Sequence, residues 1–138
     1  MLFAALLCSS YVRGQPCEVD ALLVLSRNLE SPSVMVMDKF LNSFDPSCSA
    51  NTEFAEWSNE LLFEILEYKP QLTLQRMAEL DGKAVDHLVA EILTPVGEHP
   101  LQCIYDRVKQ CPREIKLRNR ILETLRKAAK AEGTALVD

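Results

Sequence analysis

Apolar residues recur at three- and four-residue intervals along most of this chain, and seven prolines interrupt the pattern at short distances. This spacing is typical of amphipathic helices, and no stretch sustains the apolar–polar alternation of a half-buried strand. Proline suits the first turn of a helix, because its missing N–H leaves no hydrogen bond unmade there. The sequence therefore predicts an all-α fold of about seven short helices in antiparallel hairpins.

Capping residues, prolines and glycines bound the expected helices. They cover residues 18–29, 32–44, 52–67, 70–80, 83–93, 100–108 and 112–131. Ser31 is the expected N-cap of the second helix, either Asn51 or Thr52 that of the third, and Pro112 the expected start of the last.

Two arrangements of these helices stay open. Residues 61–66 resemble residues 88–93, and each segment is followed by a proline and a leucine. This degenerate repeat favours a HEAT-like stack of hairpins, with an irregular helical bundle as the alternative. A chain of 138 residues, 48% of them hydrophobic, can bury one ordinary core, so we expect a single domain over residues 15–138.

The first residues have features of an export signal. Residues 2–8 are apolar, and Gly14, with Val12 two positions before it, suits signal-peptidase cleavage. The apolar run is short and no basic residue precedes it, so the alternative is an N-terminal helix of a cytosolic regulatory domain. We predict a signal peptide over residues 1–14 and a secreted or periplasmic product. No run reaches the eighteen or more apolar residues of a membrane span.

Removal of this leader would leave an even number of cysteines, namely Cys17, Cys48, Cys103 and Cys111. Four cysteines allow three pairings, and the sequence does not choose between them. Cys17 with Cys48 would tie the first helix to the loop after the second. Cys103 and Cys111 are about 12 Å apart along a straight helix, so they pair only if the helix breaks before Pro112. Four reduced, buried cysteines are the alternative.

The segment from residue 52 to residue 67 separates charged from apolar side chains. Its acidic side carries Glu53, Glu56, Glu60, Glu64 and Glu67. Its opposite side carries Phe54, Trp57, Leu61, Leu62, Ile65 and Leu66. An ordinary solvated face explains the glutamates; the alternative is a ridge that binds a protein partner, with Trp57 contributing to the contact.

The end of the chain has the opposite charge. Residues 1–106 hold six basic and sixteen acidic groups, or −10, and residues 107–138 hold nine and four, or +5. The cations on one side of the last expected helix are Arg113, Lys116, Arg120 and Lys127. No aromatic residue follows Tyr105 to stack on bases, so we expect a protein partner and no nucleic acid. Salt-sensitive self-association between the acidic and basic surfaces is a further hypothesis, and a solvated helix is the alternative.

No catalytic motif is present: the chain lacks a P-loop, GxGxxG, GxSxG, CxxC and HxxxH. We therefore expect no cofactor, no metal site and no identifiable catalytic residue. The predicted function is protein–protein interaction or scaffolding through charged helical ridges. An enzyme, or an enzyme accessory, with a site assembled from distant residues is the alternative.

Residues 26–29, 40–48 and 53–63 together resemble a group of exported, all-helical bacterial proteins of unknown function. The similarity covers about residues 17–125. It implies a helical secreted or periplasmic protein and brings no catalytic residue with it.

Overall fold

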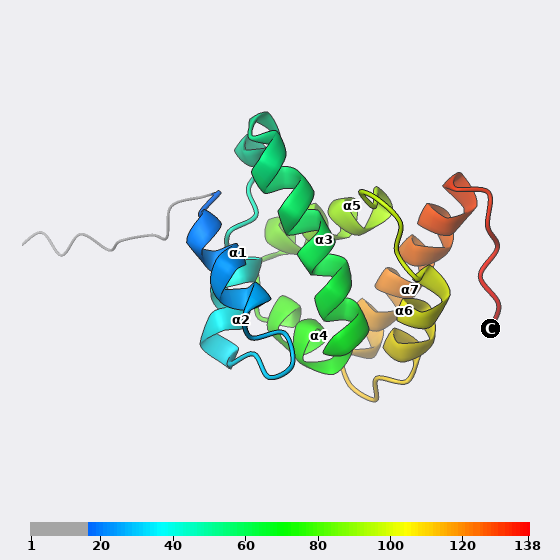
Figure 1. The fold of residues 1–138 in the computed structure, drawn as a ribbon. Coiled ribbons are helices and arrows are strands. Elements are labelled where there is room, and N and C mark those ends of the chain that lie inside the picture. The colour runs from blue at the N-terminus through cyan, green and yellow to red at the C-terminus, as the bar shows by residue number, and fades with distance from the viewer. Residues whose placement is uncertain (1–16) are drawn as a thin grey trace, which may run out of the picture.

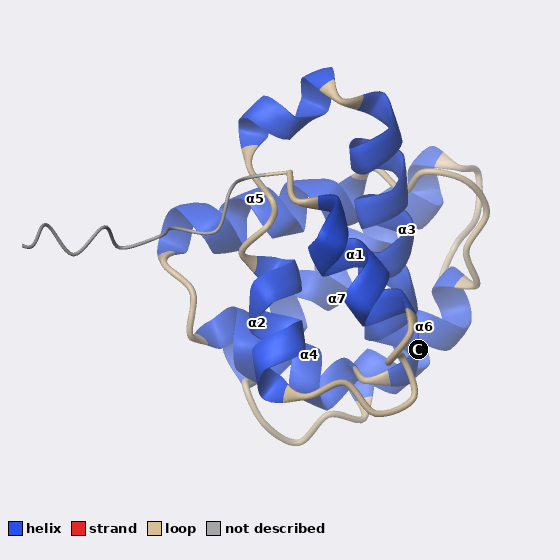
Figure 2. Cartoon of the chain, turned by 60° about the vertical axis from the view of Figure 1, so that its left-hand side comes forward, coloured by secondary structure: helices blue, strands red, loops and turns tan. Residues whose placement is uncertain are grey.

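The computed structural model describes residues 17–138, and all regular structure in this part of the chain is helical (Figure 2). The helices are α1 (Val19–Ser26), α2 (Val34–Leu41), the short 3-10 helix η1 (Pro46–Ala50), α3 (Thr52–Tyr68), α4 (Pro70–Ala78), α5 (Gly82–Leu93), α6 (Leu101–Lys109) and α7 (Ile115–Ala131). The all-α fold of about seven helices is confirmed. The expected signal peptide, residues 1–14, lies outside the described residues.

Six of the helices form two rows (Figure 1). One row runs α1, α3, α6 and the other runs α2, α4, α7, and the successive pairs α1/α2, α3/α4 and α6/α7 also contact each other. The arrangement is that of stacked helical hairpins. Helix α5 departs from it, because it packs against one member of each row, α3 and α7. Residues 61–66 and 88–93 lie in α3 and α5, so the expected repeat does not mark equivalent positions.

Most helix boundaries follow local chemistry, with two corrections. Ser33, not Ser31, caps α2, because Ser33 has extended backbone and its hydroxyl accepts from Val36 N at 3.2 Å. The last helix begins at Ile115 and not at Pro112, since the preceding Glu114 has a left-handed backbone with φ 54°. Of the two expected N-caps of α3, Asn51 is the one found, and its side chain accepts from Phe54 N.

Helix α3 lies at the centre of the fold and is buried on most of its circumference. Its buried residues are Phe54, Ser58, Asn59, Leu61, Leu62, Phe63, Ile65 and Leu66. The predicted apolar side is therefore confirmed except at Trp57, which is half-buried against the core. A wide buried surface of this kind removes enough apolar area from water to make α3 the main packing element.

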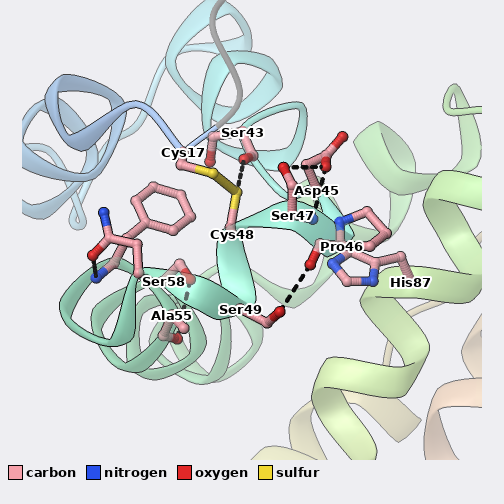
Figure 3. Close-up of a disulfide and its surroundings, with 12 residues drawn as sticks. Cys17, Ser43, Asp45, Pro46, Ser47, Cys48, Ser49, Ala55, Ser58 and His87 are labelled. Carbon is pink, nitrogen blue, oxygen red and sulfur yellow. Dashed lines mark hydrogen bonds between the residues drawn. A yellow bond between two sulfur atoms is a disulfide. The ribbon is translucent and has the colours of Figure 1, made fainter.

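Cys17 and Cys48 form a disulfide with a Cα–Cα distance of 5.4 Å, as one of the predicted pairings had it (Figure 3). The bond joins the residues before α1 to η1. Cys17 N also donates to Ser43 O, in the connection between α2 and η1. Cys103 is exposed and Cys111 is buried, and both are free thiols. A disulfide fits an oxidising compartment.

Among the described residues no helix is long and apolar enough to cross a membrane.

Candidate protein-binding surfaces

The five glutamates of α3 lie on one side of the helix, and we call them the acidic ridge: Glu53, Glu56, Glu60, Glu64 and Glu67. The first three are exposed and the last two are half-buried. Within residues 17–138 no ion pair joins the ridge to any cation. The freely solvated part of the ridge is therefore its N-terminal half.

In its C-terminal half, Glu64 lies near the connection between α5 and α6, which carries His99. The ring of His99 stacks on Phe63 with centroids 4.5 Å apart, and a ring nitrogen lies 2.8 Å from Val96 O. Partial burial and the charge of Glu60 raise the pKa of Glu64, while the nearby His99 lowers it. Glu64 is thus a packed carboxylate and not a freely exposed binding group.

Of the predicted basic residues, α7 brings three together. Lys116, Arg120 and Lys127 share one side of the helix, and the outer two are eleven residues, or about three turns, apart. Arg113 is exposed but precedes the helix, so the prediction that it belongs to this side is wrong. The cause is the left-handed backbone of Glu114, which starts α7 two residues beyond Arg113.

These three cations lie along an open groove between α5 and α7, which we call the α5–α7 groove. It consists of two hollows of about 400 and 410 Å³ that meet at Arg120. The first hollow is lined by Ala78, Val85, Glu114, Ile115, Lys116, Leu117 and Arg120. The second is lined by Asp86, Val89, Ala90, Leu93, Arg120, Glu123, Thr124 and Lys127. Ile115 is 55% exposed and Leu93 41% exposed, so each hollow leaves a large aliphatic side chain open to water.

Ion pairs neutralise the middle of the groove but not its ends. Arg120 Nη2 lies 2.8 Å from Asp86 Oδ1, and Glu123 lies 3.8 Å from Arg126. Within residues 17–138, Lys116 and Lys127 make no ion pair. The groove therefore offers an apolar floor with an ammonium group near each end; Glu114 is the one lining carboxylate without an ion pair in the described part.

A buried amide that the sequence analysis missed holds α5 in place. Asn59 Nδ2 donates to Glu91 O at 3.1 Å and to Glu91 Oε2 at 2.9 Å. Its Oδ1 accepts from Val96 N at 2.9 Å. These bonds anchor the C-terminal end of α5 to the central helix, so one wall of the groove is fixed to the core. The only sequence signal was an uncharged polar residue two positions before the apolar run of α3.

A larger hollow, about 800 Å³, lies elsewhere, where residues 26–31 meet Tyr68 and Lys69. Its lining holds two cations, Arg27 and Lys69, and a single carboxylate, Glu30. Tyr68 and Lys69 are further titratable groups in its lining, which contains no histidine or cysteine.

A much smaller cavity, about 70 Å³, lies beside the disulfide and is lined by Ser58, His87 and Glu91 among others. His87 Nε2 is 3.9 Å from Glu91 Oε1. The Ser58 hydroxyl donates to Ala55 O at 3.2 Å, and Figure 3 shows it turned toward its own helix. A nucleophile–base pair needs a hydrogen bond between the serine and the histidine, and in residues 17–138 none joins these two. The described residues also contain no cluster of three or more potential metal ligands.

No protein-family model, curated protein or solved structure matches this chain. The resemblance to exported helical bacterial proteins remains a prediction. Three of the four predicted cations and two exposed aliphatic side chains lie together in the α5–α7 groove.

Proposed function

We propose that this chain is an exported protein-binding module whose α5–α7 groove receives an amphipathic, carboxylate-bearing helix of a partner protein. One observation carries the proposal: exposed Ile115 and Leu93 lie in adjoining hollows that have Lys116 and Lys127 near their outer ends. Helix-in-groove recognition uses the same combination of an apolar floor and charged margins.

The geometry restricts the partner. Lys116 and Lys127 are about 16 Å apart along α7, which is the length of about three helical turns. A partner helix of that length would place aliphatic side chains at i, i+4 and i+7 over the floor and carboxylates eleven residues apart over the two lysines.

Apolar burial supplies most of the affinity in this arrangement. Fully burying one large aliphatic side chain is worth about 1.5–3 kcal/mol, whereas an exposed ion pair adds about 0.2–1 kcal/mol. Ile115, Leu93 and their counterparts on the partner therefore drive binding. The lysines set the orientation of the helix and disfavour basic partners.

A second copy of this chain is the less suitable occupant. Glu53 and Glu64 of α3 have the same eleven-residue spacing, but the apolar side of α3 is buried in its own core. Only charges would meet the groove, and contacts of that kind weaken as salt rises. Light scattering at low and high salt tests whether the chain associates with itself. A monomer under both conditions rules out self-association, and an oligomer that dissociates at high salt would mean that a second copy occupies the groove.

The Cys17–Cys48 disulfide supports the exported setting, because such bonds persist in oxidising compartments. Together with the expected leader, it favours a mature product that begins at Gln15. An intact-mass measurement on natively produced protein checks this. The mass of a chain cut after Gly14 and lacking two thiol hydrogens supports export, and an uncut, fully reduced chain overturns it.

Binding can be tested with a designed peptide in a helical conformation, carrying three leucines at i, i+4 and i+7 and two glutamates eleven residues apart. The matched peptide has glutamines in place of the glutamates. We expect K116E/K127E to lose about tenfold or more of the affinity for the acidic peptide, whereas R27E/K39E, with the same charge change just after α1 and in α2, retains it. Equal losses in the two variants, or no binding of either peptide to the wild-type chain, would overturn the proposal.

A further inference from the structure

The last residues of the chain, 134–138, run back beside α6 (Figure 1, red) and contact both α6 and α7. The chain turns at Gly133, whose φ of 81° suits glycine. Gln102 of α6 then pairs with the backbone of Val137 twice: Nε2 donates to Val137 O at 2.9 Å, and Oε1 accepts from Val137 N at 2.9 Å. Such a pairing binds an extended peptide backbone whatever its side chain is.

The carboxylate of Asp138 is bound by side chains from both helices. Its Oδ1 accepts from Tyr105 OH at 2.5 Å and from Arg126 Nη2 at 2.6 Å, and Lys109 Nζ lies 3.7 Å away. Arg126 also donates to Tyr105 OH and lies over its ring, 5.1 Å from the centroid. Charge-assisted hydrogen bonds of this kind are directional, so the site selects a carboxylate at one position.

The two remaining side chains complete the pattern. Leu136 is half-buried against the hydrophobic core, whereas Val137 is 70% exposed. Along residues 136–138 a half-buried aliphatic side chain is therefore followed by an exposed residue and then by a bound carboxylate.

We propose that this α6–α7 surface is a binding site for an extended segment of a partner protein with the pattern aliphatic–any–acidic, which residues 136–138 occupy within the same chain. The site uses other residues of α7 than the α5–α7 groove, because Arg126 binds Asp138 and lines neither hollow, whereas Arg120 binds Asp86 of α5. A partner segment has to displace the intramolecular one. A tethered segment competes at an effective concentration in the millimolar range. The chain's own segment therefore lowers the apparent affinity for a partner segment, and only a partner segment with a higher intrinsic affinity displaces it.

The test uses the full chain with its own segment disabled by L136D/D138K, and D138K alone as a milder variant that retains Leu136. The probe is the acetylated and amidated peptide Glu-Gly-Thr-Ala-Leu-Val-Asp, which has the sequence of residues 132–138. In ¹⁵N NMR spectra we expect the peptide to shift signals of Gln102, Tyr105 and Arg126 in both variants. Its affinity for L136D/D138K should exceed that for the wild-type chain by about tenfold or more.

Two controls make the result specific. A peptide with asparagine in place of its aspartate should bind about tenfold more weakly, and Q102A in the L136D/D138K background should weaken the parent peptide. Absence of shifts in a variant with a folded spectrum would overturn the proposal, as would equal binding of the two peptides. A wild-type dimer that exchanges these segments would also overturn it, because the occupant would then be a second copy.

Discussion

Arg120 Nη2 of α7 lies 2.8 Å from Asp86 Oδ1 of α5, and this ion pair crosses the α5–α7 groove where its two hollows meet. The side chains are 46% and 67% exposed, so the pair contributes little to the stability of the fold. It keeps the middle of the groove neutral, between the two lysines at its ends.

Removing the carboxylate should change binding more than stability. D86N leaves Arg120 positively charged and unpaired, so we expect the acidic helical peptide to bind a few-fold more tightly, while the free energy of unfolding changes by less than about 1 kcal/mol. R120Q should bind the peptide more weakly. Peptide titration and urea unfolding measure the two effects, and weaker binding by D86N would contradict the assigned role of the pair.

The disulfide should matter much more to stability. Cys17 and Cys48 are 31 residues apart, and closing a loop of that length in the unfolded chain is worth about 3–4 kcal/mol in the chain-entropy model. We expect C17S/C48S to lose that amount in urea unfolding. C103S, which alters an exposed free thiol, is the matched control and should unfold like the wild-type chain. Equal stability of C17S/C48S and the control would show that the bond is not formed in the native protein.

Asn59 should be the most sensitive polar residue of α3. N59L keeps a side chain of similar size but removes the hydrogen-bond partner of Val96 N and of the Glu91 side chain. Each buried polar group that loses its hydrogen bond lowers the free energy of unfolding by about 1–3 kcal/mol. We also expect faster hydrogen exchange at the Val96 amide. N42L removes an amide whose bond to Asp38 O is exposed, so its loss of stability should stay below about 1 kcal/mol. A similar loss in both variants would argue against a specific anchor at Asn59.

Glu64 gives a pH-dependent prediction. Partial burial, followed by the charge of Glu60, raises its pKa, so the folded chain binds a proton more readily than the unfolded chain. The ionised carboxylate therefore destabilises the fold at neutral pH, and its contribution to stability recovers as the pH falls through the raised pKa.

E64Q should accordingly be more stable than the wild-type chain at pH 7, and the difference should vanish below the ordinary carboxyl pKa of about 4.3. E53Q, at the exposed start of the acidic ridge, is the matched control and should show little difference at either pH. Unfolding curves at several pH values measure both. A difference for E64Q that does not depend on pH would mean that its side chain acts through packing and not through its charge.

Local patterns predicted the helices well, because apolar spacing and proline positions act within a few residues. They also predicted the apolar side of α3 and included Cys17–Cys48 among the pairings. The corrections at Ser33 and Glu114 concern single backbone conformations at helix starts, where adjacent serines or prolines offer competing solutions.

The surfaces were less predictable, since they depend on contacts between distant residues. Asp86 neutralises Arg120 from 34 residues away, and His99, 35 residues after Glu64, lowers the pKa of that glutamate. Neither contact leaves a periodic pattern of residues in the sequence from which it could be predicted. The contact of Asp138 with Tyr105 joins residues 33 apart in the same way, and the sequence analysis did not anticipate it.

The most direct test of the α5–α7 groove is a methyl NMR titration of the full chain with the acidic helical peptide. Ile115 and Leu93 line the two hollows and are open to water, whereas Ile104 is buried in α6 and serves as the internal reference. We predict saturable shifts of the Ile115 and Leu93 methyl signals, no shift of Ile104, and markedly smaller shifts with the glutamine peptide. Unchanged Ile115 and Leu93 signals, or shifts confined to another surface, would contradict the account.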